Sequence, residues 1–156
     1  MTATPDEAPL TLDQQLCFSL YATSRLLTRA YQPLLEPMGI TYPQYIVLMI
    51  LWEEAPCPVS RICQRALLNT NTLTPLLKRL EQLGYVSRQR RAGDERVVEI
   101  GLTAAGAALQ AQCRCIPAEL LKGAGMPLEN LQALKAQLDE LLRAMLAQEA
   151  VGGDPA

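Results

Sequence analysis

The chain has 156 residues, of which 49% are hydrophobic and 4% aromatic, and its formal net charge is -2. This length predicts about one domain with an ample core, and the abundance of leucine and alanine favours helices. The nearly balanced charge does not by itself indicate a nucleic-acid partner, and the odd number of cysteines argues against a constitutive disulfide framework. We find no signal peptide and no membrane-spanning run, and therefore expect a cytoplasmic protein with no membrane partner and loose tails over residues 1–10 and 148–156.

Two helices are predicted before residue 55. Residues 11–14 have the spacing of a capping box, and the apolar pattern behind them predicts a first helix that runs to about Leu35. Residues 41–44 repeat that spacing before an almost wholly apolar stretch over 45–52, which predicts a helix buried on most sides. Pro56 and Pro58 then predict a loop, after which Ser60 can cap a short helix that continues through Ala66.

A second helix of a helix-turn-helix is predicted from Asn69 to Gly84. The polar side chains of residues 69–72 can accept hydrogen bonds from first-turn amides, and Gly84 can end the helix. One face of this segment is apolar, with Leu73, Leu76, Leu77, Leu80 and Leu83. The opposite face carries groups that can reach base edges and phosphates, namely Thr72, Thr74, Lys78, Arg79 and Gln82.

A basic hairpin is predicted behind this helix. Residues 85–91 lead into a turn over 92–95, and Val98, Ile100 and Leu102 alternate with exposed positions as in a half-buried strand. From Arg61 to Arg96 there are eight basic and three acidic residues, a local balance of +5 that leaves -7 for the rest of the chain. Such a cationic patch is typical of a surface that binds nucleic acid, although a solvated helix and hairpin would show the same charges.

The last part of the chain predicts two further helices. Thr103 opens an alanine-rich helix to about Leu121, bent or interrupted at Pro117, and Pro127 starts a final helix with a long leucine stripe. That stripe is either core or an intersubunit surface, because a two-fold dimer would space two recognition helices by about 34 Å.

We therefore expect a mainly α fold with a small β-hairpin wing, built as a single domain over residues 11–147. Residues 41–102 would form the winged helix-turn-helix, and residues 11–35 and 103–147 the dimerisation helices.

Five ordered segments resemble the MarR family of winged-helix regulators, and within it the organic-hydroperoxide-sensing repressors of the OhrR type. They are QLCFSLY at 15–21, YQPLL at 31–35, ITYPQY at 40–45, LTPLLKRLE at 73–81 and DER at 94–96. The likeness extends over roughly residues 11–145. It implies a homodimer that binds a pseudo-palindromic, double-stranded operator.

The resemblance implies that Cys17 is the peroxide-reactive thiol. Tyr31 and Tyr42 would donate hydrogen bonds to it from the partner subunit, and Tyr21, one helical turn later, would share its face. Only a thiolate attacks a peroxide oxygen, and phenolic hydroxyls can stabilise that anion. Without the resemblance, a lone cysteine in an apolar helix would be read as buried packing.

The sequence does not identify the resolving thiol, which would form a disulfide with an oxidised Cys17. Two-cysteine members of the family carry it near the start of the last helix, where residues 123–126 of this chain contain no cysteine. Cys113 and Cys115 lie shortly before that region and could serve from the partner, or a small cellular thiol could serve instead. We interpret Cys57 and Cys63 as packing or incidental surface residues.

For DNA, the resemblance assigns a set of side chains to the major groove and its phosphates: Thr70, Asn71, Thr72, Thr74, Pro75, Lys78 and Arg79. Arg96 would enter the minor groove, oriented by Asp94, with the other wing arginines, Arg88, Arg90 and Arg91, near the backbone. Residues 69–71 are Asn-Thr-Asn where the family usually has Asp-Ser-Gly, so the base contacts, and hence the operator, can differ.

The function predicted from these features is that of a repressor that releases its operator when an organic hydroperoxide oxidises Cys17. An alternative is release by a small phenolic or aromatic ligand in the dimer crevice, with an inert Cys17. A thiol peroxidase is a remote alternative, because nothing in the chain resembles a peroxidase, so we expect no enzyme. No cofactor or metal is expected either, because Cys113 and Cys115 lack histidine partners and the usual zinc spacing.

Overall fold

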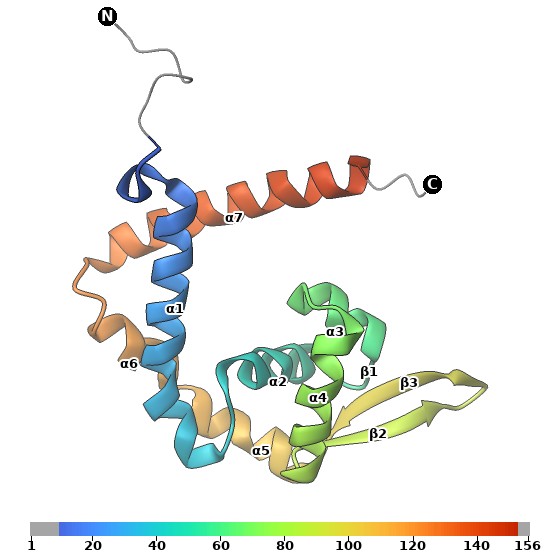
Figure 1. Ribbon diagram of the computed structural model, residues 1–156. Coiled ribbons are helices and arrows are strands. Elements are labelled where there is room, and N and C mark those ends of the chain that lie inside the picture. The colour runs from blue at the N-terminus through green and yellow to red at the C-terminus, as the bar shows by residue number, and fades with distance from the viewer. Residues whose placement is uncertain (1–9, 153–156) are drawn as a thin grey trace, which may run out of the picture. The chain divides into compact units, whose positions relative to one another are not determined.

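The computed structural model describes residues 10–152, which form helices and one three-stranded antiparallel sheet (Figure 1). The elements are η1 Leu12–Gln14, α1 Leu16–Leu35, η2 Glu36–Met38, α2 Tyr42–Glu54, β1 Cys57–Pro58, α3 Val59–Ala66, α4 Thr70–Gln82, β2 Val86–Arg91, β3 Asp94–Leu102, α5 Ala104–Cys113, α6 Ile116–Lys122 and α7 Leu128–Gly152. The predicted mainly α fold with a β-hairpin wing is therefore confirmed. The chain divides between Ile116 and Pro117 into two compact units.

The predicted tails fall mostly on residues 1–9 and 153–156, which lie outside the described residues. The tail predicted over residues 148–152 was wrong, because these residues continue α7 to Gly152. Gln148, Glu149 and Ala150 are good helix formers, so nothing local ends the helix there. Within residues 10–152, no single helix is long and apolar enough to cross a membrane, whereas α1 with η2 and α2 would pass that test only as a pair bent by 71°.

The first long helix ends where the sequence predicts but begins later. Residues 12–14 form a short 3-10 helix, and Thr11 makes no side-chain cap. The backbone is extended at Gln15, with φ -90° and ψ 117°, so α1 begins only at Leu16. The capping box predicted at residues 11–14 was therefore wrong. α1 ends at Leu35, and Gly39, with φ 70°, turns the chain toward α2.

The second helix forms the centre of the first unit. Thr41 N donates to Gln44 Oε1 at 2.8 Å, which is part of the predicted capping box. Six of the thirteen residues of α2 are buried, among them Val47, Leu48 and Leu51. The prediction of a helix buried on most sides is confirmed.

The region between α2 and α3 differs from the predicted loop. Cys57 and Pro58 form the short strand β1, which pairs with Ile100 and Glu99 of β3. Because Pro58 is extended and Val59 already belongs to α3, the predicted cap at Ser60 was wrong. The predicted end of this helix at Ala66 is confirmed.

The helix-turn-helix is completed by α4. Leu67 adopts a left-handed conformation, with φ 53°, and reverses the chain between the two helices. Asn69 Oδ1 accepts a hydrogen bond from Thr72 N at 2.8 Å and so caps α4 as predicted. Leu73, Leu77 and Leu80 are fully buried, which orients the helix with its polar face outward.

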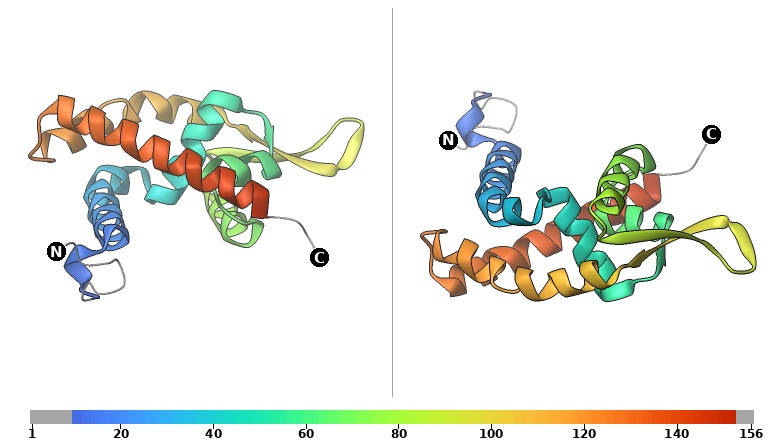
Figure 2. Two further views of the ribbon diagram at one scale, coloured as in Figure 1. Left: turned by 90° about the horizontal axis from the view of Figure 1, so that it is seen from above. Right: turned by 90° about the horizontal axis from the view of Figure 1, so that it is seen from below.

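The wing is the hairpin of β2 and β3, and Figure 2 shows it extending away from the neighbouring helices. Its register runs from Val86 opposite Leu102 to Arg90 opposite Val98, and is irregular at Arg91. Ile100 is buried, but Val97, Glu99 and Gly101 are half-buried like Val98 and Leu102, so the predicted alternation with exposed positions was wrong. The outer positions are partly covered because Glu99 pairs with Arg91 and Gly101 lies against the side chain of Ser87.

Behind the wing, Thr103 Oγ1 accepts a hydrogen bond from Gly106 N at 3.0 Å and caps α5. The predicted interruption is present but lies at Arg114 and Cys115, before Pro117. Pro117 instead occupies the first turn of α6, where its missing N–H costs no helical hydrogen bond. The final helix begins at Leu128, directly after Pro127, as predicted.

Candidate nucleic-acid interface and thiol site

The predicted DNA-contacting side chains of α4 lie together on its exposed face. All seven are exposed: Thr70, Asn71, Thr72, Thr74, Pro75, Lys78 and Arg79. The hydroxyl of Thr74 donates to Thr70 O at 2.8 Å and keeps its lone pairs for an outside donor. Burial of the leucine face therefore presents small polar groups at the start of the helix and cations one turn later.

The structure separates the basic residues between Arg61 and Arg96 into those that pair with carboxylates and those that do not. Arg61 pairs with Glu54 at 2.7 Å, and Arg65 pairs with Glu53 at 2.9 Å and also with Glu54. The hydrogen bond from Arg61 is the main cause that lowers the pKa of Glu54. These two arginines therefore join α3 to α2, and the local balance of +5 overstates the unpaired positive charge of this surface.

In the wing, two of the predicted arginines also have carboxylate partners. Arg88 lies 3.6 Å from Glu81 of α4, and Arg91 lies 2.7 Å from Glu99 across the hairpin. Arg90 Nη1 donates to Glu95 O at 3.1 Å. Within residues 10–152, the cations of this surface without an ion pair are Lys78, Arg79, Arg90 and Arg96.

Asp94 acts on the wing tip through the backbone. Its Oδ1 accepts a hydrogen bond from the backbone N of Arg96 at 3.2 Å, while the Arg96 guanidinium has no partner among the described residues. The carboxylate therefore shapes the chain that carries Arg96 and leaves its cation available.

A groove of about 370 Å³ joins α3, α4 and the wing. It is lined by Pro58, Val59, Ser60, Thr70, Thr74, Arg88, Arg96, Val97 and Val98. The fold thus brings Thr70 and Thr74 of the recognition helix to the same surface as Arg96, which the sequence separates by more than twenty residues. Ser60 belongs to this surface but was predicted only as a helix cap.

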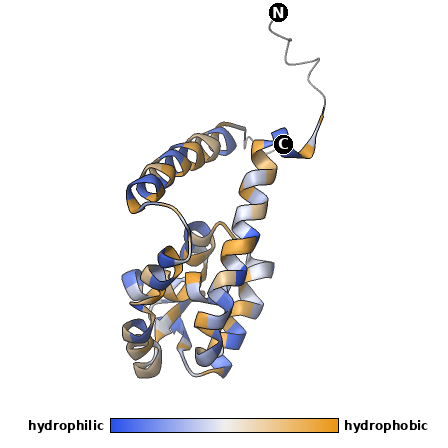
Figure 3. Ribbon diagram, turned by 90° about the vertical axis from the view of Figure 1, so that its left-hand side faces the viewer, coloured by the Kyte–Doolittle hydropathy of each residue, from blue (hydrophilic) through white to orange (hydrophobic). Residues whose placement is uncertain are grey.

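Cys17 lies in the first turn of α1 and is exposed. Tyr21, one turn later, is 59% exposed, and its ring lies under the Arg25 guanidinium, 5.6 Å from the centroid. Leu16 is 65% exposed and Leu26 60%. The exposed side chains of Leu16, Tyr21 and Leu26 give α1 an uncovered apolar surface, and Figure 3 shows hydrophobic residues recurring along this helix.

Tyr31 and Tyr42 pack against each other, with ring centroids 4.5 Å apart. Tyr45 lies 5.8 Å from Tyr31, and Trp52 continues the cluster 6.1 Å beyond Tyr45. Burial, and then the neighbouring Tyr42, raise the pKa of Tyr31, and burial raises the pKa of Tyr45 to about 12. Tyr31 and Tyr45 therefore remain neutral hydroxyls at physiological pH. Tyr45 and Trp52 were expected only as core residues. Their spacing from Tyr42 along one helix was the feature of the sequence that could have predicted an aromatic cluster.

The other four cysteines occupy different environments. Cys113 is buried, its Sγ donates to Met38 Sδ at 3.5 Å, and burial raises the pKa of its thiol. Cys115 is exposed, and its Sγ donates to Gln112 O at 3.6 Å. Cys57 is buried in β1, and burial raises its pKa as well, whereas Cys63 is half-buried and lies 3.9 Å from Thr70 Oγ1. All five are free thiols.

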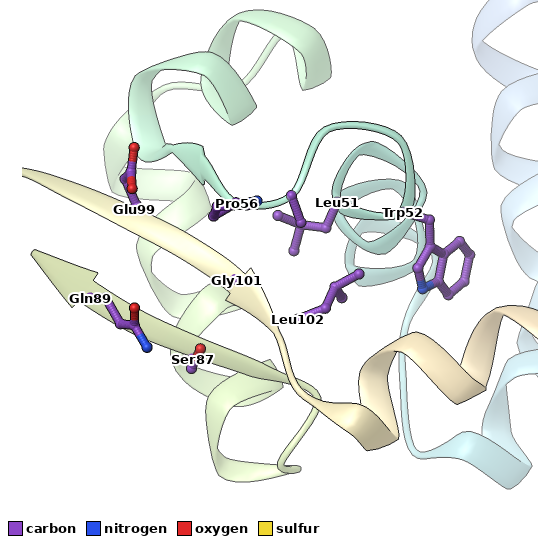
Figure 4. A pocket seen from close by; sticks show the side chains of 9 residues that line it. Leu51, Trp52, Pro56, Ser87, Gln89, Glu99, Gly101 and Leu102 are labelled. Carbon is purple, nitrogen blue, oxygen red and sulfur yellow. The ribbon is translucent and has the colours of Figure 1, made fainter. Parts of the chain in front are cut away.

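Further cavities lie elsewhere in the first unit, and two of them border α2. One of about 420 Å³ separates the end of α2 from the root of the wing, with Leu51, Trp52 and Leu102 against Ser87, Gln89 and Glu99 (Figure 4). A second, of about 370 Å³, lies between the end of α1 and the start of α2 and is lined in part by Tyr42.

Comparisons with known proteins agree on a class of regulator. Residues 29–112 match the family described as transcriptional regulator SarA/Rot. The organic hydroperoxide resistance transcriptional regulator of Bacillus subtilis (strain 168) is 44% identical over 134 residues, which cover 86% of this chain and 91% of that protein. The HTH-type transcriptional regulator TtmR of Methylorubrum extorquens (strain PA1) is 46% identical over 134 residues, covering 86% of this chain and 69% of TtmR.

Among solved structures, AbfR of Staphylococcus epidermidis is 38% identical, with a TM-score of 0.73, and covers 87% of this chain and 94% of its own. Three further AbfR structures are described as reduced and bound to DNA, overoxidised and bound to DNA, and disulfide-formed. Their TM-scores are 0.68, 0.70 and 0.60, and they cover 84% to 86% of this chain.

A helix-turn-helix with an exposed polar recognition face and a basic wing defines a winged-helix DNA-binding regulator. The chain belongs to the MarR family of these transcriptional regulators, and its predicted resemblance to the OhrR type is confirmed.

Proposed function

We propose that this protein is a homodimeric repressor that binds its operator while Cys17 is reduced and releases it when an organic hydroperoxide oxidises Cys17. The observation that carries the proposal is the exposed thiol at the start of α1, in a chain that also holds a complete winged helix. The Bacillus subtilis relative, named for organic hydroperoxide resistance, and the redox forms of AbfR support it.

In the proposed reaction, the Cys17 thiolate attacks one oxygen of the hydroperoxide and the O–O bond breaks. The organic half leaves as an alcohol after taking up a proton, and Cys17 becomes a sulfenic acid. Tyr31 and Tyr42 of the partner subunit donate hydrogen bonds to the thiolate, with Tyr21 beside it. Tyr31 can donate because its hydroxyl is protonated at neutral pH, and burial moves its pKa further above that range.

A second thiol then attacks the sulfenic sulfur, forming a disulfide and releasing water. Of the two candidates in the partner, Cys115 is favoured over Cys113, because Cys115 is exposed and Cys113 is buried against Met38. A small cellular thiol is the other proposed resolver. AbfR is described bound to DNA in an overoxidised form, so the chemical product at Cys17 has to be identified together with DNA release.

On DNA, we propose that the exposed face of α4 enters the major groove and that Arg96 enters the minor groove. Thr70, Asn71 and Thr72 would meet base edges, and Thr74, Pro75, Lys78 and Arg79 would follow the adjacent backbone. Arg88, Arg90 and Arg91 would approach phosphates from the wing, with Asp94 holding the tip. A basic surface that reads both grooves explains binding despite the net charge of -2.

The test is operator binding by reduced and hydroperoxide-treated protein, with Cys17→Ser and Cys115→Ser alongside and intact-mass analysis of each sample. Wild type should lose affinity as Cys17 is oxidised, and Cys17→Ser should keep it. Equal release of wild type and Cys17→Ser would refute the thiol mechanism. The protein should not turn over hydroperoxide. Sustained consumption of hydroperoxide in the presence of a thiol reductant would instead indicate a thiol peroxidase, which is an enzyme.

A second candidate is a regulator released by a small aromatic or phenolic ligand, with an inert Cys17. The cavity lined in part by Tyr42 favours it, because apolar and hydroxyl groups meet there in a space of about 370 Å³. Intact mass separates the two, since the ligand mechanism predicts no selective adduct at Cys17 after one equivalent of hydroperoxide.

A further inference from the structure

Tyr85 connects the end of the recognition helix to the turn that follows α1. It lies between α4 and β2, and its hydroxyl donates to Met38 O at 2.9 Å across 47 residues of sequence. Met38 ends η2, the 3-10 turn directly behind α1. One half-buried side chain therefore links the helix that carries Cys17 to the DNA-reading element.

The backbone of Tyr85 is held by hydrogen bonds to α4 and to the residue that follows β3. Its N donates to Leu80 O at 3.0 Å, and its carbonyl accepts from Thr103 N at 3.1 Å. Thr103 Oγ1 also donates to Gly84 O at 2.5 Å. The end of α4, the start of β2 and the end of β3 are therefore joined at one point, so they move together with Tyr85.

The start of α5 is pressed onto the same peptide. A Cβ atom at Gly106 would lie 1.9 Å from Tyr85 O, so only glycine allows this approach. Trp52 Nε1 donates to Gly106 O at 2.9 Å and fixes the same turn to α2, and Figure 4 shows the indole beside α5. The Tyr85 peptide thus forms one connected unit with the end of α4, the root of the wing and the start of α5, and its phenol is the part of that unit that reaches the turn behind α1.

The other side of that turn is the tyrosine cluster. Tyr31 precedes η2 on α1 and Tyr42 follows it on α2, and their rings lie 4.5 Å apart. A displacement of Tyr31 relative to Tyr42 has to move the chain that connects them. Met38 lies in that chain, so the displacement reaches Tyr85 through a single hydrogen bond.

We infer that Tyr85 is a positioning residue that transmits a movement of α1 to the recognition helix and the wing. The inference rests on the proposed function, since oxidation of Cys17 supplies the movement. When the turn shifts, the phenol draws the end of α4 and the root of the wing with it, which changes their presentation to DNA. Without the hydroxyl, the turn moves and the reading elements stay.

The experiment compares wild type with Tyr85→Phe, which removes only the hydroxyl. Operator affinity is measured for the reduced and the hydroperoxide-treated protein, and intact mass reports the rate and product at Cys17. We expect the reduced variant to bind like wild type and to be oxidised at the same rate. The ratio of oxidised to reduced Kd should fall by roughly fivefold, the factor that corresponds to a hydrogen bond worth about 1 kcal/mol.

Trp52→Phe is the control, because it removes a hydrogen bond of equal length from the same junction but leaves the link to Met38 intact. It should keep the wild-type Kd ratio. An unchanged ratio in Tyr85→Phe, or an equal loss of affinity in both redox states, would overturn the inference. Failure of wild type itself to release DNA would overturn the proposed function and the inference with it.

Discussion

The side chain of Asn69 holds the first turn of α4 through its hydrogen bond with Thr72 N. An amide of the first turn has no helical partner, so this side chain satisfies a group that would otherwise be open to water. The same turn carries Thr70 and Asn71, for which we propose contacts with base edges, so helix stability and the proposed DNA reading depend on one turn.

Replacing Asn69 with alanine should lower the free energy of unfolding by about 1 kcal/mol, because the cap is lost. Urea unfolding followed by circular dichroism measures it. Ser60→Ala is the matched control: it also removes a small polar side chain near a helix start, but Ser60 is not the cap of α3. Equal destabilisation of the two variants would contradict the assigned cap.

Tyr45 gives the protein a defined sensitivity to alkaline pH. Its pKa is raised from 10.0 to about 12 by burial, so between these values the folded state holds a proton that the unfolded state has lost. The stability contributed by neutral Tyr45 is therefore complete below pH 10 and declines as the pH rises toward 12. Between pH 10 and pH 12, the free energy of unfolding should fall less in Tyr45→Phe than in wild type. Urea unfolding of both proteins at several pH values measures this difference. Parallel curves for the two proteins would contradict the buried, protonated phenol.

At the scale of the element, the wing and α3 use arginine for different purposes. Arg61 and Arg65 hold α3 against the carboxylates of α2, whereas Arg96 extends from a wing tip shaped by Asp94. A cation already paired in the protein releases fewer counterions from DNA than one that pairs first with phosphate.

Arg96→Ala should weaken operator binding by about tenfold and reduce the slope of log affinity against log salt by about 1, since one phosphate-proximal cation is lost. Arg61→Ala should leave that slope unchanged. Fluorescence anisotropy over a series of salt concentrations measures both. A larger change in slope for Arg61→Ala than for Arg96→Ala would reverse the assignment.

At the scale of the whole molecule, two helices expose apolar side chains that a monomer leaves in water. α1 exposes Leu16 and Leu26, and in the second unit α7 exposes Leu142 at 44% and Met145 at 57%. Figure 3 shows hydrophobic residues along both helices. Apolar surface of this extent favours burial against another chain, which supports the proposed homodimer.

Leu142→Asp combined with Met145→Asp should shift the protein from dimer to monomer and lower operator affinity at least tenfold, because a monomer reads one half-site. Analytical ultracentrifugation and anisotropy measure the two effects. The exposed polar positions of α7 offer a control in Gln137→Asp, which adds one charge without removing apolar surface. A dimer that survives the double substitution would exclude α7 from the interface.

Much of the fold could be predicted because its signals are local. The leucine spacing of α4, the cap at Asn69 and the turn at Gly93 all act between residues close in sequence. The strand β1 and the start of α3 could not be predicted, because Cys57 pairs with Ile100, 43 positions later, and a pair that distant leaves no local pattern. The ion pairs of Arg61 and Arg65 could not be predicted from a count of charges, because they join α3 to a separate helix and depend on how the two helices pack.

The sequence by itself determined that this chain is a winged-helix regulator with a thiol on its first helix, since helix periodicity, capping and family segments are written along the chain. Only the tertiary structure decided which cations are paired within the protein, which cysteines are exposed, and that Tyr85 joins α4 to the turn behind α1. The physical reason is that pairing, burial and long-range hydrogen bonds depend on distances in space, and folding brings together residues that the sequence keeps apart.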